Sequence, residues 1–134
     1  MLPEFDEHGN LPPGVHRCEI LEVVARFGID SAERQVESAE LAEFVQWARQ
    51  SGVARLIVDG SYVTAKEAPN DVDVVILPGP DYPRQEQPTL ASSRRWPFVH
   101  VQIAQDEADL QQWIDSDFGF DRDQARRGVV EILL

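Results

Sequence analysis

Cysteine and lysine are almost absent from this chain of 134 residues. Its one cysteine, Cys18, has no second thiol in the sequence with which to form an internal disulfide. A chain without disulfides fits a reducing compartment, so we expect a cytoplasmic protein in which Cys18 is a small packing residue. Lysine also occurs once, as Lys66, and all the other basic residues apart from histidine are arginines.

The chain also lacks an excess of positive charge and any long apolar run. Its formal net charge is −12, whereas a general nucleic-acid-binding surface would be basic. That charge is compatible with metal binding or with a basic protein partner. No apolar run approaches the roughly 20 residues of a membrane helix, and no signal segment opens the sequence, so we expect no membrane association.

The length and the periodicity predict one domain over 1–134, with a single core. Proline and glycine indicate an extended arm over 1–17 and a proline-rich loop over 78–97. We expect an α/β or α+β fold: a mixed sheet of about four strands with helices packed on one face. The expected helices cover 19–27, 30–50 and 107–116, and the expected strands cover 54–59, 72–77, 98–104 and 128–134.

Local patterns refine two of the predicted helices. Asp30 and Glu33 form a capping-box pattern at the start of the long helix, which would turn Val36 and Leu41 toward the core. Asp106 is the expected N-cap of the helix over 107–116.

The most informative stretch is 56–78, where two apolar runs flank a polar segment. The first run ends in Gly60-Ser61, and Asp71 and Asp73 stand at the head of the second. Residues two apart on a strand point to the same face, so both carboxylates can reach one point. Two acids held together repel each other unless a proton or a cation lies between them, and oxygen ligands suit Mg²⁺ or Mn²⁺.

An Asp-x-Asp pair is weak by itself, because the chain contains three of them. The pairs at 115/117 and 121/123 lack the buried strand and the Gly-Ser turn that accompany the first. The alternative interpretation is that Asp71 and Asp73 only keep a strand end soluble.

Gly60-Ser61, nine intervening residues and Asp71-Val72-Asp73 resemble the signature of the polymerase-β-like nucleotidyltransferase superfamily. The resemblance is closest to its small bacterial members, minimal nucleotidyltransferase domains often encoded as half of a toxin–antitoxin pair. The run from Phe5 to His16, together with 59–73, also resembles a bacterial family of nucleotidyltransferase-like domains with no assigned activity. The first likeness covers about fifty residues, and the second would cover the whole chain.

The resemblance implies a nucleotidyltransferase-like fold and a role for each residue of the motif. Asp71 and Asp73 would bind Mg²⁺ or Mn²⁺, while Gly60 and Ser61 would hold the phosphates of a nucleoside triphosphate. Thr64 and Lys66 are candidates for further phosphate contacts. In the proline-rich loop Arg84, Arg94 and Arg95 are candidates for contacts with phosphate or a partner, although solvent exposure explains them equally well.

The superfamily pattern also has a third carboxylate on a later strand, and this chain departs from it. The matching strand, over 98–104, offers His100 and Gln102 on its polar face. His100 is the candidate general base or metal ligand, with Asp106, Glu107 and Asp109 just beyond the strand as alternatives.

Two functions therefore stay open. The chain is either an enzyme that transfers a nucleoside monophosphate to a hydroxyl of a protein or small molecule, or a catalytically degenerate module that binds a protein. For either function, the resemblance makes the chain a candidate for the antitoxin half of a toxin–antitoxin pair. The sequence also leaves a homo-oligomer open.

Overall fold

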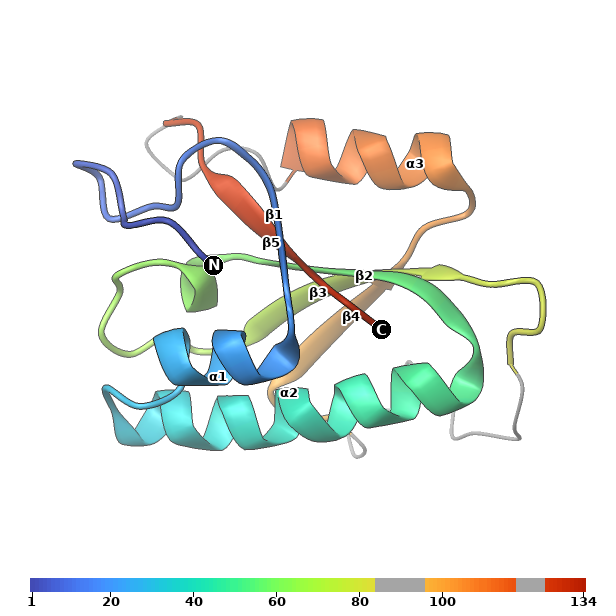
Figure 1. The fold of residues 1–134 in the computed structure, drawn as a ribbon, viewed down its shortest axis with the longest axis horizontal. Helices are drawn as coiled ribbons and strands as arrows, with labels where there is room; N and C mark the ends of the chain where they lie inside the picture. The colour runs from blue at the N-terminus through green and yellow to red at the C-terminus, as the bar shows by residue number, and fades with distance from the viewer. Residues whose placement is uncertain (84–95, 118–124) are drawn as a thin grey trace.

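Three layers make up the fold in the computed structural model, which describes residues 1–83, 96–117 and 125–134. A twisted sheet lies in the middle, with α1 and α2 on one face and α3 on the other (Figure 1). The elements in chain order are β1 (Gly14–Cys18), α1 (Ile20–Phe27), α2 (Ala32–Ser51), β2 (Val53–Asp59), the short 3₁₀ turn η1 (Ser61–Val63), β3 (Val72–Pro78), β4 (Val99–Ile103), α3 (Glu107–Gln112), the π-helical turn η2 (Trp113–Asp117) and β5 (Gly128–Ile132). Within these described ranges, none of the helices combines the length and the apolar character needed to cross a bilayer.

The described strands form one five-stranded mixed sheet in the order β1-β5-β2-β3-β4. The outer pairs, β1 with β5 and β3 with β4, are parallel, whereas β2 is antiparallel to both of its neighbours. The predicted mixture of helices with a mixed sheet is confirmed. The one strand that the sequence did not predict is β1, which lies at the end of the segment expected to be an extended arm. Only Cys18 of β1 is buried, so the strand carries almost no apolar pattern by which it could be recognised.

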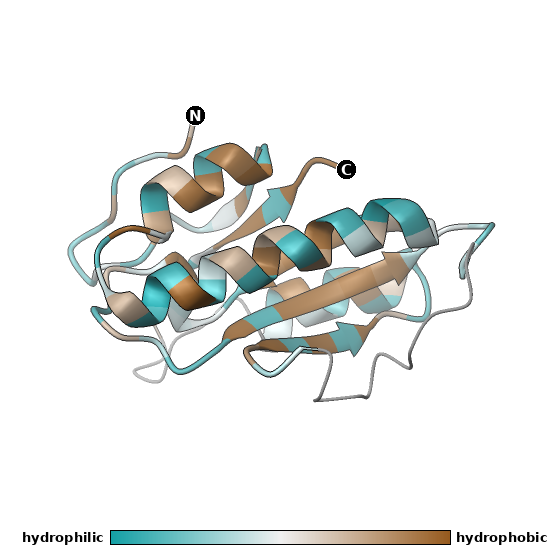
Figure 2. Ribbon diagram, turned by 90° about the horizontal axis from the view of Figure 1, so that it is seen from below, coloured by the Kyte–Doolittle hydropathy of each residue, from teal (hydrophilic) through white to brown (hydrophobic). Residues whose placement is uncertain are grey.

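Two apolar cores lie on opposite faces of the sheet. The larger packs α1 and α2 against the sheet and includes Phe27, Leu41, Phe44 and Leu56. The smaller packs α3 against the other face through Ile57, Val75, Leu110 and Ile114. The strands beneath α2 are mainly apolar, whereas α2 itself alternates between polar and apolar surfaces (Figure 2). The expectation that all helices pack on one face was therefore wrong, because periodicity predicts an apolar stripe on α3 but not which side of the sheet it covers.

Helix boundaries follow local chemistry closely. The side chain of Ser31, not Asp30, is the N-cap of α2 and accepts a hydrogen bond from the Arg34 amide. Gly52 ends the same helix in a left-handed conformation, with φ of 88°. Asp106 caps α3 as expected.

Candidate functional site

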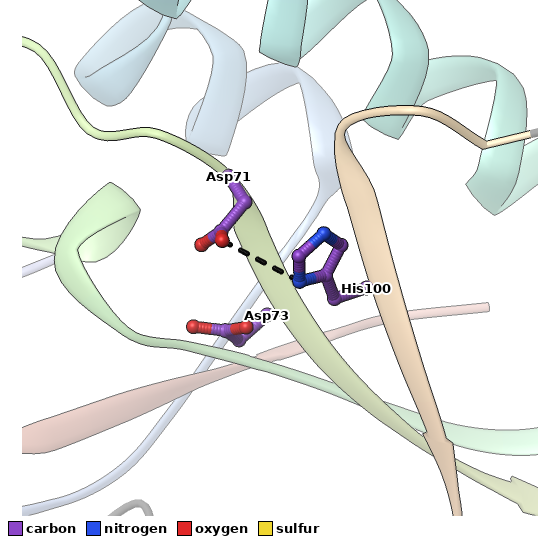
Figure 3. Close-up of side chains that lie close together, drawn as sticks. All are labelled: Asp71, Asp73 and His100. Carbon is purple, nitrogen blue, oxygen red and sulfur yellow. Dashed lines mark ion pairs between the residues drawn. The ribbon is translucent and has the colours of Figure 1, made fainter. Parts of the chain in front are cut away.

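Two aspartates and a histidine meet at one end of β3 and β4. Asp71 immediately precedes β3, Asp73 is its second residue, and the parallel register places His100 of β4 opposite Asp73. One ligand atom from each of the three side chains lies within 4.8 Å of the other two (Figure 3). His100 Nδ1 is 3.4 Å from Asp71 Oδ2. The site is open to solvent, because the His100 side chain is 58% exposed.

The electrostatics of this cluster favour a bound positive charge. Burial, and then the neighbouring Asp71, raise the pKa of the Asp73 carboxyl, while His100 and Arg127 oppose that rise. An ion that coordinates both aspartates would remove the repulsion between them. Ligand atoms of one octahedral Mg²⁺ lie about 3 to 4 Å apart, so small side-chain rotations would suffice to close the cluster around an ion. The three residues therefore fit a divalent cation, and the imidazole extends the fit to Mn²⁺ and other transition metals.

The acidic residues that follow β4 interact with groups outside the cluster. Asp106 accepts a hydrogen bond from the Asp109 amide, and Asp109 accepts one from the Gln105 amide. Glu107 forms an ion pair with Arg55 at 2.7 Å. In the described part of the chain, His100 is thus the residue of β4 that joins the two aspartates.

A third aspartate, Asp59, lies next to the cluster and was not singled out from the sequence. The antiparallel register of β2 and β3 pairs Asp59 with Asp73. The Asp59 side chain is almost fully buried, and its Oδ2 is 3.2 Å from Arg127 Nη2. Within residues 1–83, 96–117 and 125–134, its Oδ1 has no hydrogen-bond partner. Burial raises the pKa of the Asp59 carboxyl to about 7, although Arg127 opposes the rise. The sequence signal was weak: one acid at the end of an apolar run, followed by Gly60.

Gly60 is required where it stands. Its φ of 81° with ψ of −168° is a backbone region that other residues rarely adopt. A Cβ added there would lie 2.4 Å from Asp73 Oδ2. The turn therefore packs directly against the Asp73 side chain, and the phosphate-holding role of Gly60 stays a prediction.

Arg34 of α2 holds the loop that follows Gly60. Its side chain is buried, with 2% exposure, although an arginine usually stays at the surface. The guanidinium donates hydrogen bonds to the backbone carbonyls of Phe27, Ser61, Tyr62, Thr64 and Lys66. The path of this loop is therefore fixed by one side chain, which the sequence analysis missed because a charged residue in an amphipathic helix is normally assigned to the solvent face.

The residues predicted to contact phosphate have different surroundings in the structure. Ser61 opens η1 beside the cluster and is partly exposed. Thr64 uses its hydroxyl locally, donating to the Ser61 carbonyl at 2.6 Å and accepting from the Lys66 amide. The Lys66 side chain is exposed. Arg84, Arg94 and Arg95 lie outside the described residues.

Comparison with known proteins gives one match. The sequence profile of a family of unknown function, DUF6932, matches residues 3–133, which is nearly the whole chain. The chain belongs to DUF6932. A search of curated proteins and a search of solved structures each found no match.

Proposed function

We propose that this DUF6932 chain is a nucleotidyltransferase-like protein that uses Mg²⁺ or Mn²⁺ and transfers a nucleoside monophosphate to a hydroxyl of a protein or a small molecule. The single observation that carries the proposal is the convergence of Asp71, Asp73 and His100 beside the Gly60 turn. The resemblance of the Gly-Ser and Asp-x-Asp motifs to the polymerase-β-like superfamily agrees with it.

In this proposal Asp71 and Asp73 hold the divalent ion, which neutralises charge on the bound phosphates. His100 Nδ1 faces the Asp71 carboxylate, so in the neutral ring with its proton on Nδ1 the other nitrogen, Nε2, is the one that accepts a proton. Nε2 takes the proton of the acceptor hydroxyl as its oxygen bonds to the α-phosphorus. The bond from the α-phosphorus to the β-phosphate oxygen breaks, and pyrophosphate leaves.

A second candidate function is protein binding without turnover. The observation that favours it is the identity of the residue opposite Asp73, which is a histidine where the superfamily pattern has a carboxylate. The net charge of −12 would steer a basic partner, such as the toxin of a toxin–antitoxin pair, toward this surface.

Calorimetry with Mg²⁺ or Mn²⁺ and ATP or GTP tests the binding step. The parent should bind metal and nucleotide together, whereas Asp71→Asn and Asp73→Asn should each bind at least tenfold more weakly. Asp30→Asn, a change of the same kind at an exposed site, is the control. Equal binding by all four proteins would refute the proposed site.

Transfer of the label from α-labelled ATP or GTP to an acceptor, with release of pyrophosphate, tests the chemistry; the acceptors are glycerol and peptides that contain serine, threonine and tyrosine. His100→Ala should lower transfer by about 10²–10⁴, the usual loss on removing a positioned base. A parent that binds nucleotide but transfers nothing to any of these acceptors would favour the binding module.

A further inference from the structure

A hollow of about 400 Å³ lies between the start of α2 and the segments that lead into β3 and β4. Its lining includes Val36 and Glu37 of α2, Pro69 and Asn70 before β3, and Phe98 before β4. The volume is within the range of small-molecule sites, and most of the lining surface is apolar.

Two features of the lining lower the stability of the protein as long as nothing is bound in the hollow. Val36 and Phe98 are 49% and 37% exposed, so apolar side chains face water at the rim. Glu37 is 1% exposed, and its buried Oε1 has no hydrogen-bond partner among the residues that the structure describes. Buried polar atoms are nearly always paired, so an orphaned carboxyl oxygen beside a hollow indicates a missing donor.

The hollow adjoins the acidic cluster. Asn70 is bonded to Asp71, and Phe98 precedes His100 by two residues, which corresponds to roughly 7 Å along an extended chain. One ligand can therefore contact both places.

We propose that this hollow binds the base of the nucleotide whose phosphates lie at Asp71 and Asp73, an inference that rests on the proposed function. The flat ring packs against Val36, Pro69 and Phe98, and an N–H group of the base donates to Glu37 Oε1. An aliphatic ligand would fill the space but leave that oxygen unpaired, whereas a nucleobase supplies both the apolar ring and the donor.

The experiment distinguishes binding of the base from binding of the phosphates. The parent and its variants are titrated in the presence of Mg²⁺ with ATP, GTP, CTP, UTP and inorganic tripolyphosphate, which has no base. Glu37→Met removes the acceptor at similar length, and Phe98→Ala removes the ring. The matched controls are Glu43→Met, at an exposed position of α2, and Ile103→Ala, an exposed apolar residue of β4.

The parent should bind its preferred nucleoside triphosphate at least tenfold more tightly than tripolyphosphate. Glu37→Met and Phe98→Ala should each weaken binding of that nucleotide about tenfold but leave the affinity for tripolyphosphate unchanged. Both control variants should bind the nucleotide and tripolyphosphate as the parent does. Circular dichroism and a thermal melt of each variant verify that it is folded.

The outcomes distinguish the two proposals. If the parent binds the four nucleotides and tripolyphosphate equally, or if the two hollow variants bind nucleotide as the parent does, the base site is refuted and the phosphate site stands. If the parent binds neither nucleotide nor tripolyphosphate, both proposals fail.

Discussion

Replacing Glu37 with methionine should stabilise the protein, and the gain should grow with pH. Burial raises the pKa of the Glu37 carboxyl from 4.5 to about 7, and Asp71 and Glu33 add to the rise, while Arg34 opposes it. The Tyr62 hydroxyl also interacts electrostatically with this carboxyl. Because the folded-state pKa is above the unfolded one, the folded protein holds an extra proton between these values, and stability falls as pH rises through that window.

The magnitude follows from the size of the shift. A pKa difference of one unit is equivalent to 1.36 kcal/mol, so ionised Glu37 destabilises the folded protein by about 3 kcal/mol above pH 7, and by much less at pH 5. Methionine has no charge to bury. Arg34, the opposing cation, keeps its bonds to backbone carbonyls when Glu37 is removed. The stabilisation by Glu37→Met should therefore be about 2 kcal/mol larger at pH 8 than at pH 5.

Urea unfolding of both proteins between pH 5 and 8 measures this difference directly. Other groups with raised pKa values, Asp59 above all, are present in both proteins and cancel in the comparison. Two stability curves that run parallel over the whole range would show that Glu37 does not titrate in this window and would refute the reasoning.

Three further substitutions test the support of the site. Arg34→Met should cost about 3–5 kcal/mol in urea unfolding, because it removes the donor of hydrogen bonds to five backbone carbonyls, of which the bonds to Phe27 and Tyr62 are buried. Arg49→Met at the exposed end of α2 should cost under 1 kcal/mol, and a small loss at Arg34 would contradict its role in holding the loop. Gly60→Ala should destabilise by more than Gly14→Ala, since both glycines have positive φ but only Gly60 would place a Cβ against Asp73, and equal melting temperatures would count against the close approach. Asp73→Asn should raise the melting temperature of the metal-free protein, because it removes a charge that burial and Asp71 disfavour. It should also abolish any increase in melting temperature on adding Mn²⁺, and an increase that persists in the variant would exclude Asp73 as a ligand.

The sequence predicted the parts of the site that depend on strand alternation. The run 72–77 is apolar on both faces, so β3 could be recognised and Asp71 and Asp73 placed on one side of it. The alternation over 98–104 placed His100 on a polar face. What alternation cannot supply is register, and it is the pairing of Asp73 with His100 that brings the two strands' side chains together.

The buried face of α2 could be predicted only in part: Leu41 is buried as expected, but four members of that face, Ser51 among them, are polar. Arg34, Glu37 and Ser38 face the interior, whereas Val36 is half-exposed, the reverse of the expected assignment. Arg34 is buried because the loop carbonyls satisfy all its donors, and Ser38 because its hydroxyl bonds to that of Tyr62. The loop carbonyls and the Tyr62 hydroxyl are about thirty residues away in sequence, so no local sequence pattern predicts these contacts.

The position of β5 in the sheet has a consequence for synthesis in the cell. β5 is inserted between β1 and β2, yet it leaves the ribosome after the other four strands. Until it arrives, β1 has no partner in the sheet and one edge of β2 is open, so its unpaired amides and carbonyls are free to bind other chains. Helix α2 and the β2–β3 hairpin can associate earlier, because they are contiguous in the chain. A nascent chain that lacks β5 would therefore expose this edge of β2 to chaperones.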